Sequence, residues 1–318
     1  MTIHQHSHTH HTIHDMKSHM HYGWDRDLKP ILEVDPGQSA SFEIIECSGG
    51  QLTKNSSAEE LKELDFDTIN PVSGPVYIKG AKPGDTLEVE ILDFRSLEWG
   101  WTGCIPGFGL LTDDFPDPLL KTYDLTGNTK TEFLPGIELF MKPFPGTIGV
   151  ALPEKGQFSV VPPRKNGGNM DLRHLTRGSK LYLPVWVEGA LFSVGDTHAA
   201  QGDGEVCGTA IEASMEISVR FKLHKGKSIA EPRYSIPGPP TPEADSRGYY
   251  VTTGHGEDLF KASQNAIRYM IEHLTETYGL KPGEAYMLCS VAVDLRINEI
   301  VDQPNWLVSA FLPNAIFK

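Results

Sequence analysis

Strict alternation of apolar and polar side chains is the clearest pattern in this chain, and it lies between residues 209 and 223. Apolar residues occupy the odd positions and polar residues the even ones: Ile211, Ala213, Met215, Ile217, Val219, Phe221 and Leu223 alternate with Glu212, Ser214, Glu216, Ser218, Arg220 and Lys222. A period of two residues is typical of a strand with one buried face and does not fit a helix. The pattern predicts a strand with Glu212 on the face away from the core.

Short units of a turn followed by an apolar-rich run occur three times. Glycine or proline turns precede residues 40–45, 86–92 and 180–185, and the whole chain contains 31 Gly and 23 Pro. Many short runs bounded by turn residues are typical of β-proteins. We interpret the three units as strands of a sandwich or barrel.

Helical periodicity is concentrated near the C-terminus. Apolar residues recur at steps of three and four between Leu259 and Leu274, with Asp258 before them and Gly279 after them. A second, shorter helix is predicted at 284–288 and a last strand at 306–311. The Gly-, Pro- and Asp-rich stretches 101–130 and 225–250 are interpreted as loops.

The predicted fold is therefore mainly β, with β-sandwich or barrel-like subdomains and a smaller α+β C-terminal part that carries one long helix. The predicted organisation has four parts. They are a His-rich disordered tail (1–21), an N-terminal β domain (22–160), a central β region with an acidic, Gly-rich loop (161–250) and the C-terminal α+β element (251–318).

Composition narrows the possible partners and the compartment. Among 318 residues, 28 Lys and Arg stand against 42 Asp and Glu, which gives a formal charge of −14 and makes nucleic acid or anionic membranes poor partners. No apolar run approaches the roughly 20 residues of a transmembrane helix, and the first residues lack the apolar core of a secretory signal. The four Cys form no C-x-x-C pair. Reduced thiols in a cytoplasmic protein are therefore expected.

The densest group of chemically active side chains lies at 195–205, after a predicted strand. If the chain is extended there, Asp196 and His198 share a face and offer two ligands to a divalent metal. Nearby glycines allow a sharp turn, which could bring Asp203 and Glu205 back to the same centre, with Glu212 as a further ligand.

Other interpretations of this region stay open. Gly-Asp pairs are common in hairpin turns, and carboxylates with few His ligands also suit calcium, so the loop could belong to a β-sandwich binding module with a calcium or sugar site. Cys207 could act as a nucleophile, although neighbouring carboxylates oppose a thiolate. His255 lies on a Gly-rich segment and could contact a substrate, whereas His174 is interpreted as a helix-end or surface residue. The polar loop 164–171, with Asn169, is either a capped turn or a wall that recognises an amide.

Several long motifs, in the same order along the chain, resemble the acetamidase/formamidase family. They are His21-Tyr22-Gly23-Trp24-Asp25, Ser73-Gly74-Pro75 with Gly80-Ala81-Lys82-Pro83-Gly84-Asp85, Pro163-Arg164 with Gly167-Gly168-Asn169-Met170-Asp171, Gly195-Asp196-Thr197-His198 with Gln201-Gly202-Asp203-Gly204-Glu205, and Ala292-Val293-Asp294-Leu295-Arg296. The resemblance implies a cytoplasmic homo-oligomer that hydrolyses formamide, acetamide or similar amides. It also implies a divalent metal as cofactor, zinc before calcium.

On this hypothesis each candidate residue has a role. Asp196, His198 and Glu212 would hold the metal, and Glu205 or Asp203 would take a proton from water and pass it to the leaving nitrogen. Gln201 and Asn169 would hydrogen-bond the substrate amide. The eight histidines among residues 1–21 would take no part, because a disordered segment cannot fix catalytic geometry.

Overall fold

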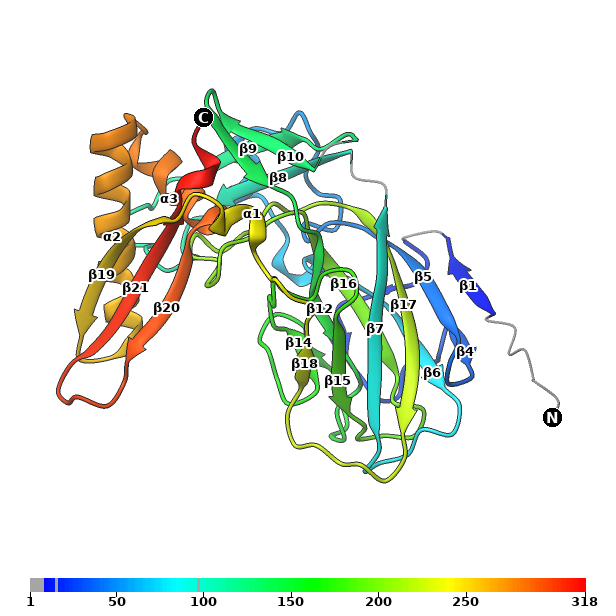
Figure 1. The fold of residues 1–318 in the computed structure, drawn as a ribbon. Helices are drawn as coiled ribbons and strands as arrows, with labels where there is room; N and C mark the ends of the chain where they lie inside the picture. Colours follow the sequence, from blue (N-terminus) through cyan, green and yellow to red (C-terminus); the bar gives the residue numbers. More distant parts are fainter. Residues whose placement is uncertain (1–8, 15–16, 96–97, 128) are drawn as a thin grey trace.

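Two six-stranded sheets form the larger part of the molecule and share one hydrophobic core (Figure 1). The computed structural model describes residues 9–14, 17–95, 98–127 and 129–318. The first sheet has the order β1 (His10–Ile13), β5 (Ser39–Ile44), β17 (Met215–His224), β7 (Thr86–Arg95), β15 (Lys180–Pro184), β18 (Arg233–Ser235). The second has the order β14 (Gly167–Asn169), β12 (Phe144–Gly149), β16 (Phe192–His198), β6 (Val72–Ile78), β2 (Met20–His21), and β4 (Leu32–Val34) also pairs with β6.

Aromatic side chains join the two sheets across the core. The ring of Phe192, on β16, lies 6.1 Å from that of Phe42 on β5 and 5.1 Å from that of Phe221 on β17. All three are fully buried. The contacts place β16, the strand that carries the predicted site, directly against the first sheet.

The strand predictions are confirmed for the most part. The three turn-and-strand units form β5, β7 and β15, all in the first sheet, and β17 lies between β5 and β7. Ile217, Val219 and Phe221 point into the core, as the alternation predicts. The strand begins at Met215 rather than at residue 209, because the chain before it turns to form single bridges with two other segments, and Glu212 makes both.

The C-terminal part is a three-stranded sheet covered by helices. The sheet has the order β19 (Tyr249–Gly256), β21 (Trp306–Pro313), β20 (Asp294–Glu299), and α2 (Leu259–Tyr278) and α3 (Pro282–Ala292) pack with it. Asp258 caps α2 by accepting a hydrogen bond from the main chain of Lys261, and Gly279 ends it in a left-handed conformation. Both predicted helices and the last strand are thus confirmed.

Short elements complete the chain. Three two-stranded sheets pair β3 (Gly23–Trp24) with β13 (Phe158–Ser159), β8 (Trp99–Cys104) with β9 (Leu119–Asp124), and β10 (Lys130–Leu134) with β11 (Ile137–Phe140). The helical turns are η1 (Ala58–Lys62), η2 (Phe66–Thr68), α1 (Pro242–Asp245) and η3 (Asn314–Ile316). Among the described residues, no helix is both long and apolar enough to cross a membrane.

The predicted organisation differs from the structure in three places. Residue 160 is no boundary, because each six-stranded sheet takes strands from both 22–160 and 161–250. The segment 101–130 is not only loop, since it holds most of β8 and all of β9. Part of the His-rich segment is ordered: β1 pairs with β5, and β2 pairs with β6. Residues 1–8 and 15–16 of that segment lie outside the described residues.

One histidine of this segment has a structural role. The Nδ1–H group of His21 donates to the carbonyl of Gly23 (2.8 Å), so Nε2 accepts from the Ser193 hydroxyl (2.8 Å). Burial lowers the pKa of His21 from 6.5 to about 4. The neutral ring thus links the N-terminal segment to β16.

We expect acid to weaken the fold through His21. Below pH 6.5 the unfolded chain binds a proton that the folded protein does not bind until about pH 4. The free energy of unfolding should therefore fall by about 3 kcal/mol across this interval, at about 1.4 kcal/mol per pH unit. Urea unfolding of the wild type and of His21→Gln between pH 4 and 7.5 measures this free energy. The variant should be less stable at pH 7.5 and should lose less stability on acidification; parallel curves would contradict the assignment.

Candidate active site: a buried carboxylate and imidazole cluster

The end of β16 and the approach to β17 bring three of the predicted residues together. Main-chain hydrogen bonds from Ala199 to Ile211 (2.8 Å) and from Ala213 to Thr197 (3.0 Å) align the two segments. His198 and Glu212 therefore lie opposite each other as a bridge pair, with Asp196 two residues before the histidine. All three side chains are almost completely buried.

The Nε2 atom of His198 faces two carboxylates. It lies 3.0 Å from Oδ1 of Asp196 and 3.1 Å from Oε2 of Glu212. Burial opposes a charge on the imidazole, but Glu212 and Asp196 outweigh it and hold the pKa of His198 well above its ordinary value. The centre of the cluster therefore demands a positive charge, from a proton on Nε2 or from a cation.

The other ring nitrogen fixes the orientation of His198. Its Nδ1 atom lies 3.0 Å from Oε1 of Gln201, and the amide nitrogen of Gln201 donates to the carbonyl of Asp171 at 3.1 Å. Because this amide oxygen can only accept, Nδ1 carries a proton and Nε2 is directed at the carboxylates. The ring of Phe144 packs at right angles against the imidazole, with 5.0 Å between centroids.

Asp171 and Glu205 form a second group of titratable side chains beside the first. Ligand atoms of Asp171, Glu205 and His198 all lie within 4.8 Å of one another. Burial is the main cause that raises the pKa of Asp171 and raises that of Glu205 well above its ordinary value, and the charge of Asp171 adds to the shift of Glu205. Two carboxyl groups this close do not both ionise, so the pair holds a proton.

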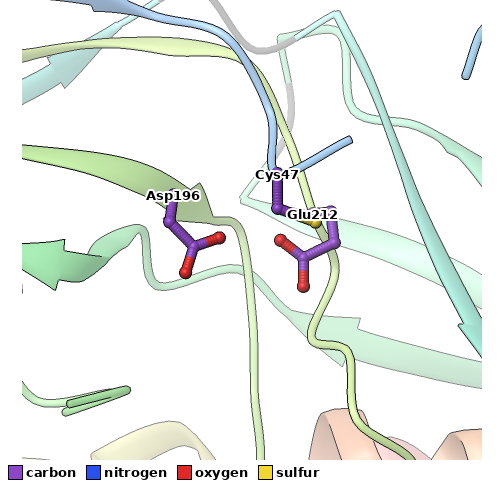
Figure 2. A group of neighbouring side chains, drawn as sticks. All are labelled: Cys47, Asp196 and Glu212. Atoms are coloured by element: carbon purple, nitrogen blue, oxygen red, sulfur yellow. The ribbon is translucent and has the colours of Figure 1, made fainter. Parts of the chain in front are cut away.

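Cys47 completes the cluster on the side of Glu212. Figure 2 shows the carboxylates of Asp196 and Glu212 facing each other, with Cys47 beside Glu212. The ligand atoms of the three residues lie within 4.8 Å of one another. Burial, followed by the charges of Glu212 and Asp196, raises the pKa of the thiol well above its ordinary value. The group is therefore a protonated thiol and not a nucleophile ready to react.

Polar side chains from β12 and from the segment before β6 lie against Asp196. The hydroxyl of Thr147 lies 3.2 Å from Oδ2 of Asp196 and donates to Oδ1 of Asn169 at 2.7 Å. The amide nitrogen of Asn70, turned toward the carboxylate, lies 3.2 Å from the same Oδ2 atom. Thr147 and Asn70 thus both contact the Oδ2 atom of Asp196.

The backbone is strained at the site. Six non-glycine residues among those described have a positive φ between 45° and 59°, and four of them belong to the cluster: Asn70, Asp171, Asp196 and Glu205. Such conformations are costly for residues with a Cβ and persist where the surrounding structure fixes them. Their concentration here indicates that the positions of these side chains matter for function.

An apolar cavity of about 370 Å³ opens above the cluster. Its floor includes Asn70, Asn169, Asp196, Glu205 and Glu212, and its walls are mainly apolar. A concave apolar site with a few convergent polar groups is typical of a small-molecule site.

The loop between His198 and Glu212 is fixed by the C-terminal part. The main chain of Gly202 donates to Ser290 (2.8 Å), and the main chain of Leu295 donates to Asp203 (2.9 Å). The main chain of Asp203 donates to the carboxylate of Asp294 (3.1 Å), which also pairs with Arg173. Gly202 and Asp203 of the predicted constellation are thus bound to the C-terminal part.

The structure brings most, but not all, of the predicted site residues together. Asp196, His198, Glu205, Glu212 and Asn169 converge. Asp203 does not line the cavity, because its main chain is bound to the C-terminal part. Gln201 also lies outside the cavity lining, and its amide is engaged by His198 and Asp171. Its place in the structure is that of a positioning residue rather than a substrate contact.

The weaker candidates lie elsewhere. Cys207 is fully buried and does not line the cavity, so a substrate has no access to it. His255 is exposed on β19. His174 lies near Arg173, outside this cavity.

Sequence reasoning missed four members of the site: Cys47, Asn70, Thr147 and Asp171. Asp171 could have been found, because it ends the Gly-Gly-Asn-Met-Asp motif of the polar loop that the sequence analysis interprets as either a capped turn or an amide-recognising wall. Cys47, Asn70 and Thr147 stand in no motif of their own.

The chain matches the model of the acetamidase/formamidase family over residues 7–157 and 154–318. It belongs to that family. A protein named formamidase from Methylophilus methylotrophus is 30% identical over 369 residues, which cover 94% of this chain and 89% of that protein. An acetamidase from Mycolicibacterium smegmatis is also 30% identical, over 84% of each chain.

Solved structures of similar proteins extend the comparison to the fold. A gamma lactamase from Delftia acidovorans superposes with a TM-score of 0.89 at 28% identity, over 97% of this chain and 93% of that one. An acetamidase from Bacillus halodurans gives a TM-score of 0.67 at 30% identity, over 96% and 97% of the two chains. The family fold thus extends across nearly the whole chain.

The donor set at the centre of the cluster fits a divalent metal. Oδ1 of Asp196 and Oε2 of Glu212 lie 3.0 and 3.1 Å from Nε2 of His198. An imidazole with carboxylates is a donor set that zinc accepts. Oε2 of Glu212 is buried, and its 3.1 Å approach to Nε2 of His198 is not aligned as a hydrogen bond. A buried carboxylate oxygen without an aligned donor is a strong acceptor for a cation.

We expect Gly146→Ala to inactivate the site. A Cβ at Gly146 would lie 2.6 Å from Oδ1 of Asp171 and from Oδ2 of Asp196, and 2.7 Å from Cε1 of His198. Displacing these groups by a fraction of an ångström to 1 Å should lower kcat by about 100-fold. The assay is hydrolysis of formamide, the substrate given by the names of the relatives, and thermal unfolding monitors the fold. Gly238→Ala is the matched control, because a Cβ there meets nothing within 4 Å. Equal activity of the two variants would contradict the arrangement.

Proposed function

We propose that this protein hydrolyses short aliphatic primary amides, such as formamide and acetamide, to the carboxylate and ammonia. One observation carries the proposal: four buried carboxylates surround one imidazole, and three of them, Asp196, Glu205 and Glu212, line an apolar cavity. The family and the names of its members, formamidase and acetamidase, support amide hydrolysis. A gamma lactamase also cleaves an amide C–N bond, so the Delftia protein supports the same class of reaction.

An unactivated amide needs help at three points. The carbonyl must become a better electrophile, water must lose a proton, and the nitrogen must gain one. We propose that Asp196, His198 and Glu212 hold a divalent metal, zinc rather than calcium, because an imidazole lies at the centre of the donors. Such an ion polarises a carbonyl oxygen and lowers the pKa of bound water toward about 7.

Proton transfer belongs to the Glu205 and Asp171 pair. The pair holds a proton at the pH where one isolated carboxyl group would have lost it. Its ionised oxygen takes the proton from the attacking water, and the pair then donates a proton to the nitrogen as the C–N bond breaks. Asp171 thus replaces Asp203, which the sequence analysis proposed, as the second carboxyl group of the proton transfer. Asn169 lines the cavity, and its amide nitrogen is the group proposed to orient the substrate carbonyl.

We also propose that the enzyme acts in the cytoplasm as a homo-oligomer. The family resemblance supports this proposal.

We expect His198→Ala and Glu205→Gln each to reduce formamide hydrolysis by about 1,000-fold or more. The first removes the central imidazole, and the second removes the proton acceptor but keeps the shape of the side chain. Ammonia release measures activity, and circular dichroism checks the fold. His174→Ala and Glu257→Gln are the controls, because neither residue belongs to the carboxylate and imidazole cluster. Activity similar to wild type in either site variant would overturn the assignment.

Removing the metal should abolish activity. The test uses protein that lacks residues 1–8, which contain three of the histidines, so that adventitious binding there does not obscure the measurement. Chelator treatment followed by elemental analysis should give inactive, metal-free protein, and zinc should restore ammonia release. Full activity without metal would refute the metal site and leave amide hydrolysis itself standing.

A further inference from the structure

The cavity above the cluster is much larger than formamide or acetamide requires. Its volume of about 370 Å³ lies within the range of roughly 300–1,000 Å³ that is common for pockets of drug-sized ligands. One water occupies about 30 Å³ in the liquid, and formamide is only a few times larger than water. Most of the space therefore remains after the amide group has been placed on the polar floor.

The walls are built mainly from aliphatic and aromatic side chains, which have no polar group to offer a substrate. They come from the region of η1 and η2, from the loop after β8 and from the segment after β13: Leu64, Phe66, Ile69, Ile105, Phe108 and Val161. None of the described residues that line the cavity is Lys or Arg, whereas three are Asp or Glu. A substrate with a carboxylate or phosphate group would therefore find no Lys or Arg side chain in this lining to pair with it. The cavity favours a neutral, apolar substituent.

Two aromatic rings at the cavity stay exposed to solvent. Phe66 is 53% exposed and Phe108 is 44% exposed. Phe108 lies against Gly208, where a Cβ would meet its ring at 2.4 Å, so the glycine allows the ring to approach the site loop. Exposed rings next to a polar reaction centre gain free energy when an apolar group covers them.

We propose that the site hydrolyses primary amides of larger uncharged apolar acids, such as benzamide and hexanamide, more efficiently than acetamide. This inference rests on the proposed amide hydrolysis. The amide lies on the polar floor at Asn169 and Glu205, and the acyl group fills the apolar part of the cavity beneath Phe66 and Phe108. The reaction is the same addition of water across the C–N bond, with ammonia as the leaving group.

The first test compares kcat/KM for formamide, acetamide, hexanamide, benzamide and L-glutamine with the metal-loaded enzyme. Hexanamide and benzamide should exceed acetamide by at least tenfold, because one methylene in an apolar pocket already changes kcat/KM by about 10- to 200-fold. The charged L-glutamine should not be hydrolysed. If formamide is hydrolysed and benzamide is not, this inference is wrong and the proposed function stands. If no amide is hydrolysed, both are wrong.

Variants of the walls identify the cavity as the cause. Ile105→Trp fills the apolar part, and it should lower the ratio of kcat/KM for benzamide to that for formamide by at least tenfold. Ile297→Trp, the same change at an exposed position of β20, should leave both values as in wild type. Phe108→Ala, at an exposed ring, provides a second variant that does not disturb the core, and it should raise KM for benzamide by about tenfold. An unchanged substrate ratio in both wall variants would overturn the proposal.

Discussion

The mutual repulsion of four acidic side chains around one imidazole is the constraint on which the rest of this structure depends. Asp171, Asp196, Glu205 and Glu212 cannot all carry charge in a place that water hardly reaches, so the group must bind a positive charge or keep protons. Against the effect of burial, Glu212 and Asp196 raise the pKa of His198, whereas burial, together with the neighbouring carboxylates, raises the pKa values of Asp171 and Glu205. Amide hydrolysis requires two functions: a centre that binds a cation, and a neighbouring acidic pair that retains a proton.

Such a group assembles only if something else holds it, and two hydrophobic cores do so. Val194 and Ile217, on either side of the site, belong to the core between the six-stranded sheets. Ala199, Val206 and Ile211, within the site loop, belong to the core of the C-terminal part. The loop therefore passes from one core to the other, and the titratable groups lie between the two cores. Burial of apolar side chains on both sides offsets the cost of the repulsion and of the strained backbone at Asp196 and Glu205.

The sequence predicted what is local and missed what depends on distant packing. Alternation revealed the core-facing residues of β17, and the short Asp196–Glu212 stretch contains most of the cluster, so its members could be found without a structure. Asp171, Asn70 and Cys47 come from other strand ends, and only the order of strands in the two sheets brings them in. The same limit explains the boundary predicted at residue 160, since local patterns do not show that strands from both sides share sheets. The sequence placed Gln201 near the cluster, but its amide points at His198 rather than into the cavity, and that direction depends on tertiary packing.

Access separates the active centre from other reactive groups of this chain. Hydrogen bonds from Cys104, Ser290 and Thr209 outweigh burial and lower the pKa of Cys207, and His21 is hydrogen-bonded to Ser193 in a pair that resembles an activated hydroxyl. Both Cys207 and Ser193 are buried, and neither lines the cavity above Asp196 and Glu212. Their bonds serve packing, because a nucleophile that no substrate can reach contributes nothing to the reaction rate. At the carboxylate and imidazole cluster, raised pKa values of buried acidic groups coincide with an apolar cavity, and this coincidence is the physical reason to place the chemistry there.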